Sequence, residues 1–309
     1  MPDLVFDFSS SPEGGSLRRL HAYVDYFEKS PLLTHFFVSA GLDDPERIYD
    51  KVKSTSVAKS NVDKVLVRTR YLDQLKQQPK WFFSYGLPVS RPIGESNWMH
   101  ISNVLPFSYA HCTLDKHLKR KSWLQQLQFK HFAGNNDVVS GESQFAVDSY
   151  QTTTKYTGET FVARNGVTRF PRTHEPREAY ALAVGTHSYK RVDLTYELFL
   201  AERERLGVHK LKLIGDLSSV PEHVANADYI ECYSYLSQED LIAAFNQASL
   251  FISTSEVENS SLAVLEALTL TGKAVLSDIP SHREMLEHSK VREFHLNGRN
   301  YLEVEALPE

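Results

Sequence analysis

Cysteine, excess basic charge and long apolar runs are all scarce in this sequence, and each shortage excludes a class of protein. Two cysteines, Cys112 and Cys232, are too few for a disulfide framework, so we expect both to remain thiols in a reducing compartment. The 34 basic residues against 39 acidic ones leave a net charge of −5, which gives no general attraction for nucleic acid. No apolar run approaches about 18 residues, and acids stand where a signal peptide would be basic. We therefore expect a cytoplasmic protein without a spanning segment.

Several common catalytic signatures are missing as well. The chain has no Gly-x-x-x-x-Gly-Lys, no His-Glu-x-x-His, no Gly-x-Ser-x-Gly, and no Gly-x-Gly-x-x-Gly after a predicted strand. It has no Asp-x-Asp pair, and its 13 histidines lie without the spacing of metal ligands. We expect neither a bound metal nor a cofactor.

What the chain does contain is the composition of an ordinary globular protein, with 41% hydrophobic and 24% charged residues. Its 309 residues suffice for two domains of about 150 residues each. Apolar runs predict strands at 4–9, 34–38, 64–67, 81–85, 97–104, 137–140, 180–184, 210–214, 229–232, 250–253 and 274–277. Helical spacing predicts helices at 17–27, 114–132, 193–205, 238–247 and 262–269. This alternation predicts an α/β protein whose parallel sheets are covered on both faces.

One segment, residues 161–177, interrupts the alternation. It carries Asn-Gly, two prolines and four arginines without clean periodicity, which is typical of an interdomain connection. We therefore predict an N-terminal domain over residues 1–167 and a C-terminal domain over residues 168–309.

The most informative stretch is 255–268, where Glu258 and Glu266 are eight residues apart. If a helix begins near residue 261, Glu266 shares a face with the apolar Leu262 and Leu265. A carboxylate there needs a partner, because an unpaired buried charge is costly. Glu258 would precede the helix N-terminus, whose amides can hold an anion. The chemistry alone leaves open whether the pair binds a ligand or Glu266 is paired in the core and Glu258 is solvated.

The spacing Glu258-x7-Glu266 resembles the Glu-x7-Glu motif of the retaining, nucleotide-sugar-dependent glycosyltransferases of family four. Residues 237–255 and 272–284 are similar to the segments that flank this motif in the family. The resemblance implies the GT-B fold, with two Rossmann-like domains whose parallel sheets face a central cleft. It implies an acceptor-side first domain, a nucleotide-sugar-binding second domain and metal-independent hexosyl transfer.

Weaker likenesses lie upstream in the order that the family has. Gly185 followed by Lys190 and Arg191 resembles the turn whose basic residue meets the donor diphosphate. Gly14-Gly15 resembles the glycine pair in the opening loop, where side chains would block backbone approach to the phosphates. Two further likenesses are the strand end at 213–215 and the Asn-Gly at 165–166.

The resemblance also implies roles for individual residues. Glu258 would orient the hydroxyls of the transferred sugar, and Glu266 would hold the ribose. The remaining donor-binding candidates are Gly14, Gly15, Lys190, Arg191, Asn259, Ser260, Ser261 and Leu262.

The chain departs from the family pattern at three places. Asn259, Ser260 and Ser261 stand where glycines usually flank an aromatic residue, and Thr186 stands where an arginine is frequent. The family histidine beneath the transferred sugar has no clear match. The catalytic candidates there are Asn103 at the predicted strand end and His100 nearby, with His111 as a further histidine, and each histidine has a structural alternative.

A basic stretch, Lys116–Phe132, stands out in this acidic protein because it contains no acid. Its bases Lys116, Lys119, Arg120, Lys121 and Lys130 alternate with Leu118, Trp123, Leu124, Leu127 and Phe129. Two interpretations remain. The helix contacts an anionic membrane surface, or it covers the first sheet with its leucines and tryptophan packed inward.

The sequence thus predicts a retaining glycosyltransferase that moves a sugar from a nucleotide-diphosphate donor to a glycan or lipid-linked acceptor. The resemblance suggests a role in assembly of a bacterial surface polysaccharide. Two other classes stay open: a sugar-nucleotide epimerase or hydrolase of the same architecture, and a non-catalytic sugar-nucleotide-binding partner subunit.

Overall fold

The computed structural model describes residues 3–10, 14–39, 55–58, 78–166, 170–173 and 176–305. The chain divides into two compact units, residues 1–107 with 122–163 and residues 108–121 with 164–309. The chain leaves the first unit after Ala163, whereas the sequence analysis placed the domain boundary after residue 167. The segment Ser108–Lys121 groups with the second unit, which the sequence pattern did not indicate.

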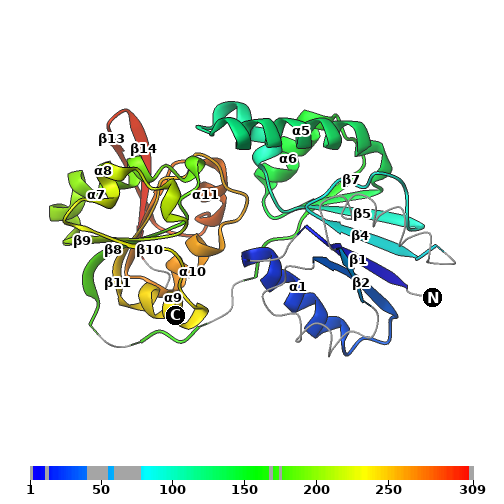
Figure 1. The fold of residues 1–309 in the computed structure, drawn as a ribbon, viewed down its shortest axis with the longest axis horizontal. Helices are drawn as coiled ribbons and strands as arrows, with labels where there is room; N and C mark the ends of the chain where they lie inside the picture. The colour runs from blue at the N-terminus through cyan, green and yellow to red at the C-terminus, as the bar shows by residue number, and fades with distance from the viewer. Residues whose placement is uncertain are drawn as a thin grey trace. The chain divides into compact units, whose positions relative to one another are not determined.

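The first unit is built on a seven-stranded sheet with the order β3-β2-β1-β4-β5-β6-β7, in which all neighbouring strands are parallel (Figure 1). Its strands are β1 Leu4–Phe8, β2 Thr34–Ser39, β3 Thr55–Ala58, β4 Trp81–Tyr85, β5 Ser96–Ile101, β6 Val138–Gly141 and β7 Glu159–Val162. Its described helices are α1 Gly14–Phe27, α4 Leu105–Ser108, α5 Lys116–Phe132 and α6 Gln144–Thr154, where α5 begins in the segment grouped with the second unit.

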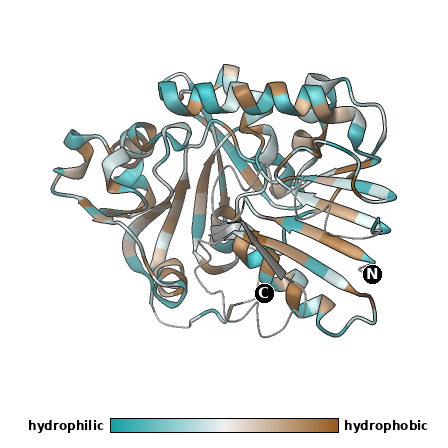
Figure 2. Ribbon diagram, turned by 45° about the vertical axis from the view of Figure 1, so that its right-hand side comes forward, coloured by the Kyte–Doolittle hydropathy of each residue, from teal (hydrophilic) through white to brown (hydrophobic). Residues whose placement is uncertain are grey.

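Alternation along the strands explains the core of this unit. Phe6 and Phe8 lie two residues apart on β1, so both point to the same face of the sheet. On that face they pack with Leu20 and Val24, which are one turn apart on α1. In Figure 2 the strands of the sheet are largely hydrophobic, whereas α1 mixes hydrophobic and hydrophilic positions. The apolar stripe of α1 and the aromatic face of the sheet thus form one core.

The second unit has another seven-stranded sheet, with the order β10-β9-β8-β11-β12-β14-β13. Its strands are β8 Glu178–Val184, β9 Lys210–Ile214, β10 Ile230–Tyr233, β11 Ala248–Ser253, β12 Lys273–Ser277, β13 Val291–Leu296 and β14 Arg299–Glu305. Its helices are α7 Val192–Leu206, α8 Glu222–Ala225, α9 Gln238–Gln247, α10 Leu262–Leu270 and α11 Pro280–Met285, with short 3-10 turns that include η3 Ser188–Lys190.

One edge of this second sheet departs from the prediction of parallel sheets. Strand β14 pairs antiparallel with both β12 and β13. Asn297 and Gly298 join β13 to β14 with φ of +49° and +77°, the left-handed conformation of a two-residue hairpin turn. The Asn-Gly pair in the sequence is the signal that identifies this hairpin, and the sequence analysis did not use it.

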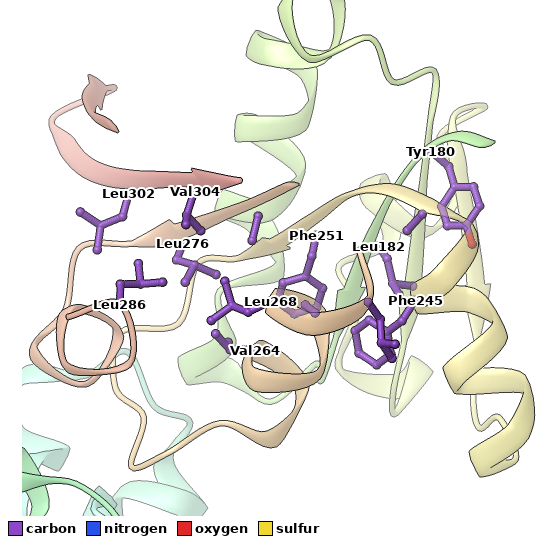
Figure 3. Close-up of a cluster of buried hydrophobic side chains, with 14 of the residues drawn as sticks. Tyr180, Leu182, Phe245, Phe251, Val264, Leu268, Leu276, Leu286, Leu302 and Val304 are labelled. Atoms are coloured by element: carbon purple, nitrogen blue, oxygen red, sulfur yellow. The ribbon is translucent and has the colours of Figure 1, made fainter. Parts of the chain in front are cut away.

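The second sheet is buried on both faces, because neighbouring strand residues point to opposite sides. Tyr180 and Leu182 of β8 join a cluster with Phe245 of α9 and Leu268 of α10 (Figure 3). Ala181 and Ala183, the residues between and after them, join the cluster on the other face with Leu198 and Phe199 of α7. The βα alternation therefore gives a doubly covered sheet, as the sequence predicted.

The sequence located many of these elements closely. The strands 81–85 and 210–214 and the helix 238–247 match β4, β9 and α9 residue for residue. The strand predicted at 97–104 ends at Ile101, and the sequence analysis missed β3, α6, β7 and the final hairpin. The strand predicted at 64–67 lies outside the described residues.

Candidate functional site

The polar groups of the second unit gather where β8, β11 and β12 end. The turn after β8 carries Lys190, the loop after β11 carries Glu258, and α11 after β12 carries His282. The carboxyl ends of parallel strands share one edge of the sheet, which is where open α/β sheets bind ligands.

An ion pair between Lys190 and Glu258 forms the centre of this site. Lys190 Nζ donates to Glu258 Oε1, and Ser255 Oγ donates to the same oxygen at 2.7 Å. The two charged side chains are only 16% and 9% exposed. Burial is the largest single influence and works to raise the pKa of Glu258, but the charge and hydrogen bond of Lys190, with smaller contributions from other neighbours, together hold that pKa below its ordinary value. Burial likewise opposes the charge of Lys190, yet Glu258 raises the Lys190 pKa, so both groups are ionised.

Gly185, at the end of β8, makes room for Lys190. Its φ of +92° favours glycine, and a Cβ there would lie 3.2 Å from the Lys190 Cε. A side chain at this position would both strain the backbone and press on the lysine. The backbone conformation and the nearby lysine therefore explain a glycine at position 185 without reference to a ligand.

Thr186 follows directly, where the family frequently has an arginine. Its hydroxyl donates to the Asp216 carbonyl at 2.8 Å, and the side chain is buried. A Cβ on Gly215 would come within 2.7 Å of Thr186 Oγ1. Thr186 is thus a packing residue that joins the ends of β8 and β9, and it brings no charge to the site.

His282 lies near the ion pair and is fully buried. Its Nδ1 is 2.8 Å from the Ser277 carbonyl oxygen, which can only accept, so Nδ1 carries the proton. Burial chiefly lowers the His282 pKa, so the ring is neutral. Its Nε2 has no hydrogen-bond partner in the described part of the chain. Ser277 Oγ in turn donates to the Ser255 carbonyl at 2.5 Å, which ties the Glu258 loop to β12.

Glu266 lies on α10, as the sequence predicted, and is 3% exposed. The residues of α10 that enter the core cluster are Val264, Ala267 and Leu268. Leu262 and Leu265 are only half-buried, so the face predicted to point into the core is instead partly accessible. Burial of Glu266 is compatible with either interpretation of the sequence, a ligand contact or a partner in the interior.

The loop before α10 is largely buried. Asn259 and Ser261 are buried, and the Ser260 carbonyl accepts from Asn165 Nδ2 at 2.9 Å. Ser261 is the N-cap residue of α10, but its side chain makes no capping hydrogen bond. The first turn of the helix, which begins at Leu262, therefore lacks the usual hydroxyl cap on its amides.

Arg191, the second basic candidate, is engaged elsewhere. Its guanidinium donates to Asp193 and to Glu256, each at 2.6 Å, and Glu256 also accepts from the Thr113 hydroxyl at 3.0 Å. The hydrogen bonds that Arg191 donates to Asp193 and Glu256 raise the Arg191 pKa further above its ordinary value. Two carboxylates already neutralise Arg191, so Lys190 is the better candidate for a phosphate ligand.

The candidates within residues 1–167, the predicted N-terminal domain, do not form one group, and His111 belongs to the segment that groups with the second unit. Gly14 and Gly15 begin α1, and residues 11–13 before them lie outside the described part of the chain. Asn103 is exposed beyond the end of β5, and its Oδ1 accepts from the Leu105 amide at 2.9 Å. Asn103 therefore caps α4 rather than ending the strand. His111 is exposed at the end of the 3-10 turn Tyr109–His111.

His100 is part of the interior of the first unit, with 0% of its surface exposed. Arg19 NH1 lies 2.9 Å from Nε2, and because arginine only donates, Nε2 accepts. Nδ1 then carries the proton and donates to Ser140 Oγ at 2.7 Å. Burial chiefly lowers the His100 pKa, and Glu142 and Tyr85 complete this buried polar group. A ring with both nitrogens engaged and no exposed surface is structural, so we do not retain His100 as a catalytic residue.

Helix α5 differs from the interpretation in which its apolar residues pack inward. Ser122 and Phe129 are buried, and Phe129 packs on Tyr150 of α6. Trp123, Leu124 and Leu127 are 46%, 44% and 43% exposed. The tryptophan and two of the leucines thus face outward among the basic residues.

Among the described residues, no helix is both long enough and apolar enough to cross a bilayer. The same residues contain no group of three or more histidine, cysteine, aspartate or glutamate residues that could hold a metal ion.

The sequence analysis missed several members of these groups. Ser255 and His282 lie inside the stretches that carry the family resemblance, three residues before Glu258 and within 272–284, so their position was available as a signal. Arg19 and Glu142 gave no such signal, because a charged residue beside an apolar stripe is ordinarily solvated.

Two Rossmann-like units, one with a buried lysine–carboxylate pair at the carboxyl edge of its sheet, make this a two-domain α/β protein, and comparison with known proteins narrows the class. Residues 167–301 match the family described as Glycosyl transferases group 1. No curated protein matches the sequence significantly.

Solved structures support the fold. HepE (Alr3699) of Anabaena, in complex with UDP and glucose, is 13% identical over 94% of this chain and 84% of its own, with a TM-score of 0.64. The N-terminal domain of Candida albicans trehalose-6-phosphate phosphatase is 11% identical over 87% and 80%, with a TM-score of 0.58. A mutant O-GlcNAc transferase of Thermobaculum terrenum is 11% identical over 93%, with a TM-score of 0.56, and this chain spans only 55% of its length.

The fold is therefore GT-B, as the sequence predicted. The match to a glycosyltransferase family lies within the second unit and covers less than half of the chain.

Proposed function

We propose that this protein is a retaining, metal-independent hexosyltransferase that moves a sugar from a nucleotide diphosphate to a glycan or lipid-linked acceptor. The observation that carries the proposal is the buried Lys190–Glu258 pair beside the first turn of α10, with Glu266 buried one to two turns further on. A cation, a carboxylate and a helix N-terminus that its N-cap side chain leaves uncapped match the phosphates and hydroxyls of a sugar nucleotide.

Each residue then has a role set by its chemistry. Lys190 and the first amides of α10 bind the diphosphate, because both are donors and the helix N-terminus carries partial positive charge. Glu258 accepts hydrogen bonds from the hydroxyls of the transferred sugar, and Glu266 accepts from the ribose. As the sugar leaves, negative charge grows on the diphosphate, and these fixed donors stabilise it.

Support for the donor class comes from the neighbour HepE, whose structure is described in complex with UDP and glucose. We extend this chemistry to the present chain, with UDP-sugars as the first donors to test. The acceptor class and a role in bacterial surface polysaccharide assembly rest on the family resemblance. So do the catalytic role of Asn103 and the donor-binding roles of Gly14 and Gly15.

We further propose that α5 contacts an anionic membrane surface that carries the lipid-linked acceptor. Trp123, Leu124 and Leu127 are exposed on a helix with five lysine or arginine residues and no acid. An outward apolar group flanked by bases is typical of helices that lie in a membrane interface. Cytoplasmic placement at the inner membrane face would follow from this contact.

The decisive experiment mixes the protein with a panel of nucleotide sugars, with and without acceptor lipids, and identifies the products. Transfer that requires acceptor supports the proposal, and retained anomeric configuration in the product supports the retaining class. Release or isomerisation of the sugar without acceptor would instead identify a hydrolase or epimerase. Binding without any turnover across acceptors would favour a sugar-nucleotide-binding subunit.

A further inference from the structure

The Lys190–Glu258 pair joins two groups that the proposed donor needs separately. Lys190 is required by the diphosphate and Glu258 by the sugar, yet in this structure each is bound to the other. The pair is internally neutral, so without donor it presents little net charge to an anion. Binding of a donor must therefore change the partners of both residues.

We propose that the Lys190–Glu258 pair is a latch that selects sugar-bearing nucleotides over free nucleotide diphosphates. This inference rests on the proposed function. A diphosphate draws Lys190 away, and only a ligand that also carries a sugar offers hydroxyl donors to the carboxylate that Lys190 leaves behind. A free nucleotide diphosphate takes the lysine and leaves Glu258 without a counter-charge.

The surroundings of Glu258 determine how strongly the latch discriminates. The titratable groups that face it are Lys190 and Tyr189 from η3 and His282 from α11. Burial raises the pKa of Tyr189 and lowers that of His282, so both are neutral. Lys190 is then the one cation at Glu258 in the part of the chain that the structure describes. Ser255 Oγ is the remaining donor, at 2.7 Å.

Loss of Lys190 as a partner reverses the direction in which the pKa of Glu258 is shifted. With the lysine gone, burial dominates and raises the pKa of Glu258, because desolvation disfavours the charged form. Glu258 then takes a proton from solvent and becomes a neutral acid. A bound sugar prevents this, because its hydroxyls donate to the ionised carboxylate. Proton uptake therefore accompanies a bare diphosphate but not a sugar nucleotide.

Titration calorimetry in buffers of different ionisation enthalpy measures this proton uptake directly. We expect wild-type protein at pH 7.5 to take up more protons with UDP or inorganic pyrophosphate than with UDP-glucose. In Glu258→Gln the part of this difference in proton uptake that comes from Glu258 should vanish. That variant should also bind UDP and pyrophosphate about tenfold more tightly, equivalent to about 1.4 kcal/mol, because no ion pair has to be broken.

Glu303→Gln is the matched control, because Glu303 is also a buried, ion-paired carboxylate of the second unit, bound to Arg205 and Lys273. We expect it to leave both the proton count and the affinities unchanged. The protons that a ligand itself binds or releases are the same for every variant. They therefore cancel when the proton uptake with one ligand is compared between variants.

Two results would overturn the latch. One is proton uptake with UDP that is the same in wild type and Glu258→Gln, which would mean that Lys190 bridges Glu258 and the phosphate together. The other is unchanged or weaker pyrophosphate affinity in folded Glu258→Gln. If the proton-uptake and affinity results appear as expected but no bound nucleotide sugar is transferred to any acceptor, the latch stands and the proposed function fails.

Discussion

Lys190 and Glu258 are 68 positions apart in the chain, yet Lys190 Nζ donates directly to Glu258 Oε1 at the carboxyl edge of the second sheet. Their mutual attraction outweighs the burial of each, so both stay charged in a largely buried place.

Lys190→Ala should weaken UDP binding by about 1.5 to 3 kcal/mol, the range for hydrogen bonds to charged groups. The reason is that Arg191 is already neutralised by Asp193 and Glu256 and offers no replacement. Isothermal calorimetry measures the change. Lys210→Ala is the control, because Lys210 forms a surface pair with Glu231. Equal UDP affinity of folded Lys190→Ala and wild type would remove Lys190 from the site.

The two glutamates should separate binding from transfer. Glu258→Gln should not weaken nucleotide diphosphate binding, which the latch predicts to become tighter, but it should lose most sugar transfer, since contacts with the reacting sugar strengthen in the transition state. Glu266→Gln should weaken the nucleotide itself by losing the ribose contact. Affinity and initial transfer rate are compared on protein whose circular dichroism matches wild type. If both variants bind and transfer normally, the carboxylates are structural.

Transfer should be independent of divalent metal, because Lys190 and helix amides provide the positive charge for the leaving diphosphate. Activity is measured with and without excess EDTA after gel filtration. Activity that EDTA abolishes and magnesium or manganese restores would contradict the proposed donor chemistry.

Reversal of Lys119, Arg120 and Lys121 to Glu should abolish binding to anionic vesicles, since each base near such a surface contributes about 1 kcal/mol. Trp123→Ser should weaken binding without a change of charge, because the exposed indole is lost from the interface. Vesicle flotation with phosphatidylglycerol and with neutral lipid measures both. Reversal of the exposed bases Lys29, Arg91 and Lys155 is the control. If the α5 variants float like wild type, the membrane role is rejected.

Acid should destabilise the fold through its buried histidines. Burial lowers the folded-state pKa of His100 and His282, so the unfolded chain binds more protons below about pH 6.5. The free energy of unfolding is therefore unaffected by these histidines above that pH. It falls as the pH falls further, by up to about 1.4 kcal/mol per pH unit for each histidine. Urea unfolding of wild type and His282→Gln between pH 7.5 and 5 checks this. Parallel curves would show that His282 does not titrate on unfolding.

From the sequence alone we could predict the fold class, most elements of the second unit and the two glutamates as site candidates. Strand and helix periodicities are local, and the spacing from Glu258 to Glu266 lies within one loop and helix, so both can be read along the chain. The hairpin at Asn297-Gly298 also had a local signal.

The contacts between polar side chains of different elements became visible only in the tertiary structure. No local pattern could join Lys190 to Glu258, fix His282 through Ser277, or commit Arg191 to Glu256, because these partners come from different strand ends. His100 was a candidate by sequence position, and its contact with Arg19, 81 positions away, makes it interior. The pattern of α5 is compatible with two orientations of one amphipathic helix, and packing of Phe129 on Tyr150 leaves Trp123 exposed. Hydrophobic pattern selects elements, but only their packing sets the dielectric and the partners that give a charged side chain its role.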